Sequence, residues 1–238
     1  MLLFYIRHGD PVYSPDSLTP LGCRQAEAVA KRLSLYGLDK IFASTSTRAM
    51  QTAKPTCELL KKELTTLDFC NENYAWEQLT VKSADGRTMW GFQEPEFSAF
   101  LNSPEIRSLG ENWHTHPRIQ NTEMYRGIQR IRTETYAFLA SLGYIHEEGK
   151  YRYRVADKKY ERVALFAHQG FGLAFLSCLL DIPYPLFCTH FDMGHSAMSV
   201  IEFAALDGYS VPRVLQLSSD SHLYREGLPT KYQNRIYF

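Results

Sequence analysis

The sequence has no excess charge of either sign and no apolar run long enough to span a membrane. Its 238 residues include 26 Lys and Arg against 26 Asp and Glu, so the formal net charge at pH 7 is zero. A neutral chain has no overall attraction to nucleic acid or to an anionic membrane. We therefore expect neither of these as a partner, and any anion must be bound by a local group of side chains.

The sequence also lacks paired cysteine spacings, internal repeats and low-complexity tracts. Five cysteines, an odd number, predict reduced thiols in a cytoplasmic protein and not a disulfide framework. The apolar run at 2–6 is too short for a signal sequence. The length fits one domain, and we assign residues 1–238 to it. Within it, the aromatic-rich stretch 70–117 is predicted to be an insertion that caps one end of a sheet.

Short apolar runs alternate with helical patterns along the rest of the chain. Strands are predicted at 2–6, 41–43, 163–167, 198–203 and 214–217, and those at 2–6 and 163–167 are expected to be buried. Helices are predicted from Thr19 to Gly37, over an apolar face from Met50 to Leu64, at 124–142 and at 171–179. Residues 151–160 alternate basic and aromatic side chains, which indicates an exposed hairpin or excursion. The alternation predicts an α/β protein, a three-layer α/β/α sandwich around a mixed, mostly parallel sheet.

Arginine and histidine follow the ends of three predicted strands. Arg7 and His8 come directly after the first, Arg48 lies just past the second, and His168 ends the third. Because the carboxyl ends of parallel strands meet at one edge, we expect these four side chains to share a pocket. Two guanidiniums suit the oxygens of a phosphate dianion, and a neutral imidazole between them can attack phosphorus without a metal.

A nucleophilic histidine also needs a proton donor for the departing alkoxide. Glu72 and Glu77 bracket an aromatic segment, Tyr74-Ala75-Trp76, that could exclude water and raise the pKa of a carboxyl group. The residues themselves leave open which of the two is the acid.

Four motifs in a fixed order resemble the histidine phosphatase superfamily, the phosphoglycerate mutase-like family. They are Arg7-His8-Gly9, Leu18-Thr19-Pro20-Leu21-Gly22, Ser44-Thr45-Ser46-Thr47-Arg48-Ala49, and Phe166-Ala167-His168-Gln169-Gly170. The resemblance implies a phosphoglycerate mutase-like fold without a cofactor or a metal. It implies that His8 becomes phosphorylated.

The resemblance also implies roles for the other site residues. Arg7, Arg48 and His168 would form the phosphate pocket, and Glu72 fits the place of the acid better than Glu77. Gln169 stands where the family commonly has glycine and would bind substrate through its backbone N–H. Ser14 and His195 are predicted as further substrate contacts.

The predicted activity is metal-independent phosphomonoester hydrolysis on a small phosphorylated metabolite, with inorganic phosphate or sulfate also fitting the pocket. Family mutases carry a Trp-Asn element soon after the first motif, whereas residues 10–19 lack it, which favours hydrolysis. Two alternatives stay open: phosphoglycerate mutase-type transfer, and a catalytically silent phospho-ligand-binding protein. The natural substrate and the oligomeric state are not predictable from the sequence.

Overall fold

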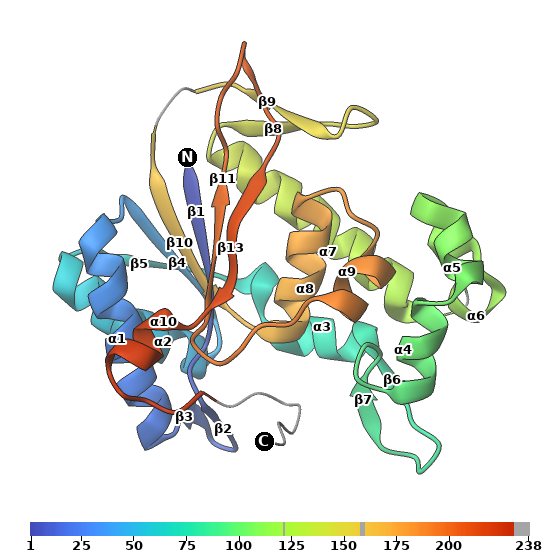
Figure 1. Ribbon diagram of the computed structural model, residues 1–238, viewed down its shortest axis with the longest axis horizontal. Helices are drawn as coiled ribbons and strands as arrows, with labels where there is room; N and C mark the ends of the chain where they lie inside the picture. The colour runs from blue at the N-terminus through green and yellow to red at the C-terminus, as the bar shows by residue number, and fades with distance from the viewer. Residues whose placement is uncertain (121, 158–159, 231–238) are drawn as a thin grey trace.

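The computed structural model describes residues 1–120, 122–157 and 160–230 (Figure 1). Part of the predicted hairpin (residues 158–159) and the last eight residues of the predicted domain (231–238) lie outside the described residues. The strands are β1 (Leu2–Arg7), β2 (Pro11–Tyr13), β3 (Asp16–Leu18), β4 (Lys40–Ser44), β5 (Leu64–Leu67), β6 (Thr80–Lys82), β7 (Thr88–Trp90), β8 (Tyr144–Glu147), β9 (Arg152–Val155), β10 (Arg162–Ala167), β11 (Met198–Glu202), β12 (Tyr209–Ser210) and β13 (Arg213–Ser219). The helices are α1 (Pro20–Tyr36), α2 (Thr47–Leu60), α3 (Glu72–Leu79), α4 (Pro95–Leu101), α5 (Pro104–Leu109), α6 (Pro117–Gln120), α7 (Glu123–Ser141), α8 (Gln169–Leu179), α9 (Tyr184–His190) and α10 (Ser221–Arg225), with short 3₁₀ turns at Asp68–Cys70 and Gly110–Thr115.

The central sheet is mixed and mostly parallel. Its six strands lie in the order β13-β11-β1-β10-β4-β5. Strands β1, β10, β4 and β5 are parallel to one another, whereas β11 is antiparallel to both β1 and β13. The carboxyl ends of β1, β10 and β4 therefore lie side by side, as the sequence predicts.

Helices cover both faces of the sheet, which confirms the predicted three-layer fold (Figure 1). Side chains alternate between the two faces along a strand. In β1, Leu3 and Tyr5 join the apolar cluster formed with α7 and α8, whereas Phe4 and Ile6 join the cluster formed with α1 and α2. All four are almost fully buried, which explains why this strand is apolar throughout.

The first two helices begin where the sequence predicts, but the second ends earlier. Thr19 caps α1 by accepting a hydrogen bond from Gly22 N, and Gly37 ends the helix with a positive φ. Helix α2 ends at Leu60 because Lys61 adopts a left-handed conformation with φ of 54°. The prediction that Leu64 continues the helical face is wrong. Leu64 begins β5 and pairs with Ile41 of β4.

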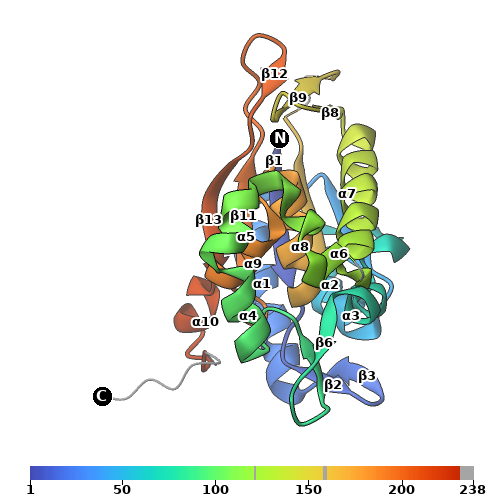
Figure 2. The same cartoon turned by 90° about the vertical axis from the view of Figure 1, so that its right-hand side faces the viewer.

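The segment predicted as a cap contains α3 to α5 and the β6–β7 hairpin. Figures 1 and 2 place α4, α5 and α6 beyond the layer of α7, α8 and α9, on the side away from the sheet. Their apolar side chains belong to the same buried cluster as one face of the sheet; these are Phe97, Phe100, Leu101, Ile106 and Ile119. Helix α3 lies nearest the carboxyl edge of the strands (Figure 1). The assignment of one domain with a cap stays a prediction.

The basic and aromatic stretch at 151–160 forms less of an exposed hairpin than predicted. Its first part is β9, which pairs antiparallel with β8. Tyr153 in this strand is fully buried, and its hydroxyl donates to Leu179 O. Across the described residues, none of the helices combines the length and apolar character needed to cross a bilayer.

Candidate active site

A pocket of about 890 Å³ lies at the carboxyl edge of the sheet. Its lining comes from the ends of β1 and β4, the β2–β3 hairpin, the starts of α2 and α8, α3, the segment 90–93 after β7 and the loop before β11. The lining residues are Arg7, His8, Tyr13, Asp16, Thr45, Ser46, Thr47, Arg48, Asn71, Glu72, Asn73, Trp76, Trp90, Gln93, Gln169 and His195. Segments that are far apart in the sequence therefore meet in one cavity, as expected for an open α/β sheet.

His8 is held as a neutral imidazole with one defined tautomer. Its Nδ1 lies 2.7 Å from Gly9 O, and because a carbonyl only accepts, Nδ1 carries the proton. Nε2 is then left with a lone pair. Burial lowers the pKa of His8 well below its usual value, and His168, Arg7 and Arg48 lower it further. The ring is uncharged at neutral pH and has the electronic form of a nucleophile.

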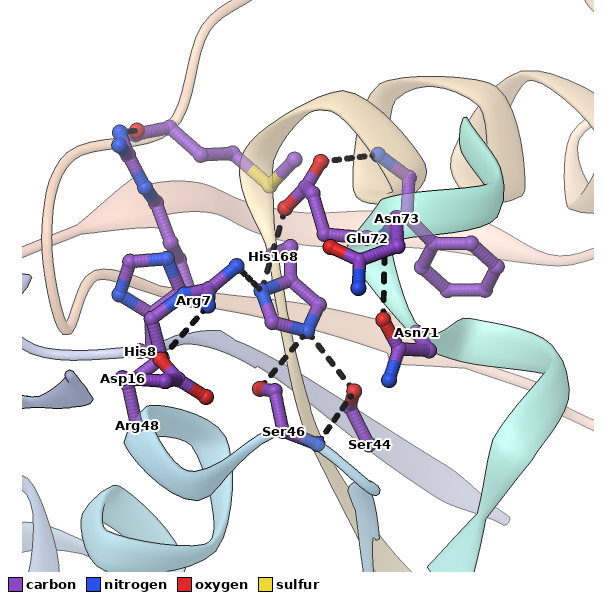
Figure 3. Close-up of polar contacts among 12 residues, drawn as sticks. Arg7, His8, Asp16, Ser44, Ser46, Arg48, Asn71, Glu72, Asn73 and His168 are labelled. Carbon is purple, nitrogen blue, oxygen red and sulfur yellow. Dashed lines mark hydrogen bonds and ion pairs between the residues drawn. The ribbon is translucent and has the colours of Figure 1, made fainter. Parts of the chain in front are cut away.

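His168 is fully buried beside His8, with a ring-centroid distance of 5.2 Å (Figure 3). Its Nδ1 accepts from Arg48 Nη2 at 3.2 Å, because a guanidinium only donates. Nε2 therefore carries the proton of the neutral ring and lies 2.8 Å from Ser44 Oγ and 3.2 Å from Ser46 Oγ. Burial, followed by the charges of Arg48 and Arg7, lowers the pKa of His168 and keeps the ring neutral.

Both predicted phosphate-binding arginines are buried and oriented by fixed partners. Arg7 donates to Met193 O at 2.5 Å and to His195 Nε2 at 2.9 Å. Burial lowers the pKa of Arg7 to about 10, so it stays charged at neutral pH.

Arg48 forms a 2.7 Å ion pair with Asp16 (Figure 3). Asp16 also accepts from Thr47 N at 2.7 Å. Asp16 thus occupies a backbone donor at the start of α2.

The structure separates the two candidate acids. Glu72 is buried at the start of α3, where its Oε1 accepts from Phe171 N at 3.1 Å and its Oε2 lies 3.1 Å from His168 Nδ1 (Figure 3). Glu77 is exposed on the same helix and does not line the pocket. Of the two, Glu72 is the one that lines the pocket.

His8, Glu72 and His168 also form a group in which one atom of each could bind a metal ion. One ring nitrogen of each histidine and one carboxylate oxygen lie within 4.8 Å of one another. The guanidiniums of Arg7 and Arg48 lower the pKa values of both histidines, and the same positive charges disfavour a cation between them. The electrostatics of this group suit an anion better than a metal.

The other predicted contacts differ in how they are placed. Gln169 and His195 line the pocket, and the Gln169 amide donates to Asp192. Ser14 is exposed in the β2–β3 turn, before a cis peptide bond to Pro15, and does not line the pocket. Tyr13 and Asp16, which pair with each other across the hairpin and therefore lie on the same face of it, line the pocket instead.

Sequence reasoning missed the residues that orient the site. Asp16, Ser44 and Ser46 hold Arg48 and His168, and Asp10 Oδ1 lies 3.4 Å from His195 Nδ1 behind Arg7. Asp10 and Asp16 are carboxylates in the loop between the first motif and α1, which is a usable signal. The sequence does not give the register of that loop, so it does not say that Asp16 meets Arg48 and Asp10 meets His195.

Comparison with known proteins gives a family and a fold. The family model "Histidine phosphatase superfamily (branch 1)" matches residues 3–116. No curated protein matches the chain. Among solved structures, a phosphoserine phosphatase from Entamoeba histolytica in complex with phosphoserine is similar, with a TM-score of 0.59 and 17% identity, covering 93% of this chain and 98% of that one.

Two mycobacterial structures are similar to the same degree. Glucosyl-3-phosphoglycerate phosphatase has a TM-score of 0.58 and 21% identity, covering 92% of this chain and 98% of that one. "Mycobacterial hydrolase 1" has a TM-score of 0.59 and 20% identity, with coverages of 92% and 98%. At these identities the likeness confirms the fold and says nothing of the substrate.

Proposed function

Because the chain belongs to the histidine phosphatase superfamily, we propose that it hydrolyses phosphate monoesters through a phosphohistidine on His8. The observation that carries the proposal is the neutral His8 ring, whose Nδ1 proton is held by Gly9 O while Nε2 keeps its lone pair beside two guanidiniums. Superfamily neighbours that are named phosphatases support the same activity.

In the first step, His8 Nε2 attacks phosphorus and the bond from phosphorus to the ester oxygen breaks. Arg7 and Arg48 stabilise the charge on the three remaining oxygens. The buried Nε–H groups of both arginines have no partner among the described residues, and a bound phosphoryl group is the kind of ligand that explains such unpaired donors.

Glu72 donates the proton that the leaving oxygen needs. Its Oε2 lies 3.1 Å from His168 Nδ1, which places the carboxyl group beside the two histidines at the phosphate-binding end. The first step requires Glu72 as a carboxylic acid and leaves it as a carboxylate. In the second step the carboxylate takes a proton from water, which attacks the phosphohistidine and releases inorganic phosphate.

The proposed substrate is a small phosphorylated metabolite, and no nucleic acid is involved. The five cysteines are free thiols, which supports the proposed cytoplasmic location because that compartment keeps thiols reduced.

Replacement of the nucleophile tests the proposal. We expect His8→Ala to lower kcat on an aryl phosphate by about a thousandfold or more, because no phosphoenzyme can form. The matched control is His190→Ala, an exposed histidine on α9 outside the pocket, which should retain activity. With a ³²P-labelled substrate, rapid quenching should trap an acid-labile phosphoenzyme whose label moves to inorganic phosphate. Unchanged activity in His8→Ala would refute the proposal, and label moving to a second alcohol would indicate a mutase.

A further inference from the structure

The part of the pocket away from the phosphate-binding residues has a distinct chemical character. We call it the outer wall. It consists of Asn71, Asn73, Trp76, Trp90 and Gln93, which come from α3, from its N-cap residue Asn71 or from the segment 90–93. Amide groups and two indole rings make up this wall. Among the described residues that line the whole pocket, Arg7 and Arg48 are the sole lysines or arginines.

The two indole rings are fixed relative to the phosphate-binding end. Trp90 packs against the start of α8 so closely that a Cβ on Gly170 would lie 2.4 Å from its ring. Trp76 meets Trp90 edge to face, with ring centroids 5.0 Å apart at 89°. Trp76 is 40% exposed although it is a large aromatic side chain. An indole held rigidly at the rim of a pocket offers an apolar surface to a ligand.

The charges of the pocket disfavour a second anionic group on the substrate. Arg7 is engaged by Met193 O and His195, and Arg48 by Asp16 and His168. Both guanidiniums are needed for the phosphoryl group. A carboxylate elsewhere on the substrate would find no further cation among the described lining residues, and it would share the cavity with the Asp16 carboxylate.

We infer that the substrate is a phosphate monoester of an uncharged, polyhydroxylated alcohol, that is, a sugar phosphate. The apolar C–H face of the sugar ring would lie against Trp76, and its hydroxyls would meet the amides of Asn73 and Gln93. A hydroxyl matched by an amide is a strong basis for specificity, since an analogue without it leaves a polar group unpaired. This inference rests on the proposed phosphatase activity. It separates the chain from its structural neighbours named for phosphoserine and glucosyl-3-phosphoglycerate, since both of those compounds carry a carboxylate.

The first test uses the wild-type protein and compares phosphate monoesters that differ in their alcohol. We expect kcat/KM for the best of a set of hexose and pentose monophosphates to exceed that for phosphoserine and 3-phosphoglycerate by about tenfold or more. A higher value for either carboxylate-bearing substrate overturns the inference. A higher kcat/KM for adenosine monophosphate overturns the inference as well, because the nucleobase and not the sugar would then lie against the indole of Trp76.

The second test changes the outer wall. Trp76→Ala should lower kcat/KM for the preferred sugar phosphate about tenfold, whereas Trp76→Phe should retain most of it. The inhibition constant of inorganic phosphate should not change in either variant, because phosphate contacts the arginine end alone. The matched control is Tyr74→Ala, which removes another partly exposed aromatic ring of α3 that does not line the pocket. Equal kcat/KM in Trp76→Ala and wild type overturns the inference.

A third variant supplies the missing charge. Asn73→Lys should raise kcat/KM for 3-phosphoglycerate several-fold and leave that for the sugar phosphate unchanged or lower. No gain for the anionic substrate would contradict the charge argument.

Failure of the inference and failure of the proposed function give different results. If hydrolysis depends on His8 but prefers anionic leaving groups, the inference alone fails. If no phosphate monoester is hydrolysed and no phosphoenzyme forms, the proposed function fails with it.

Discussion

At the scale of single residues, burial sets the protonation states on which the proposed chemistry depends. His8 and His168 are both buried beside two guanidiniums, which keeps the two rings neutral. Each tautomer is then fixed by its hydrogen-bond partner. Gly9 O can only accept from His8 Nδ1, and Arg48 can only donate to His168 Nδ1. Glu72 lies in the same environment, with its Oε2 3.1 Å from His168 Nδ1.

The role of Glu72 is tested by varying the leaving group. We expect Glu72→Gln to lower kcat on alkyl phosphates by about a hundredfold, because the alkoxide then leaves without a proton. The kcat on a nitrophenyl phosphate, whose leaving group needs no proton, should fall far less. Glu77→Gln is the matched control on the same helix and should behave as wild type in steady-state assays. Leaving-group dependence in Glu77→Gln, and not in Glu72→Gln, would reverse the assignment of the acid.

At the scale of elements, the site depends on close packing of the start of α8 against the end of β7. The start of α8 carries His168 and Gln169, and it lies under Trp90, which ends β7. Gly170 allows this contact because it has no Cβ. The position of the outer wall relative to the phosphate-binding end therefore depends on one glycine.

A methyl group at this position tests the contact. We expect Gly170→Ala to lower the free energy of unfolding by about 1–3 kcal/mol, since the new Cβ would overlap the Trp90 ring. The matched control is Gly194→Ala, where the nearest atom to a new Cβ lies at 3.8 Å and φ is not positive. Urea denaturation measures both changes. Equal stability of Gly170→Ala and wild type would mean that Trp90 does not hold α8 in place.

At the scale of the whole molecule, the C-terminal helix closes the fold against the first helix. His222 of α10 is buried, with its Nε2 3.1 Å from Ser196 Oγ and its Nδ1 3.5 Å from Arg32 of α1. Burial, followed by the charge of Arg32, lowers the pKa of His222 to about 4. The unfolded chain binds a proton at this residue near pH 6.5, whereas the folded protein does so near pH 4.

This difference predicts loss of stability in acid. Between pH 6.5 and 4 the unfolded state binds more protons, so the free energy of unfolding falls as the pH falls, by on the order of 3 kcal/mol from His222. His8 and His168 act in the same direction. The variant His222→Gln keeps an amide near Ser196. In denaturation measured from pH 7 to 4, its free energy of unfolding should fall less than that of the wild type. An identical pH dependence in the variant would show that His222 is not protonated on unfolding.

The fold and the candidate site were predictable to different depths. The apolar runs ending in Arg7-His8, Ser44 and His168 predict parallel strands whose ends meet, and the structure confirms that arrangement. The cap and stop signals at Thr19 and Gly37 also place α1 correctly. Leu64 was assigned wrongly because periodicity alone does not reveal that Lys61 turns the chain out of the helix.

The sequence by itself determined which residue types stand at the strand ends, because side-chain alternation and helix capping are local properties of the chain. The tertiary structure alone decided which side chains touch. Glu72 contacts the start of α8, which distinguishes it from Glu77. Asp16 lies beside Arg48 because of the register of the β2–β3 hairpin, which the sequence does not give. Hydrogen bonds and desolvation act at distances of a few ångströms between residues far apart in the chain, so tautomers, pKa directions and the neutral outer wall exist only once the chain has folded.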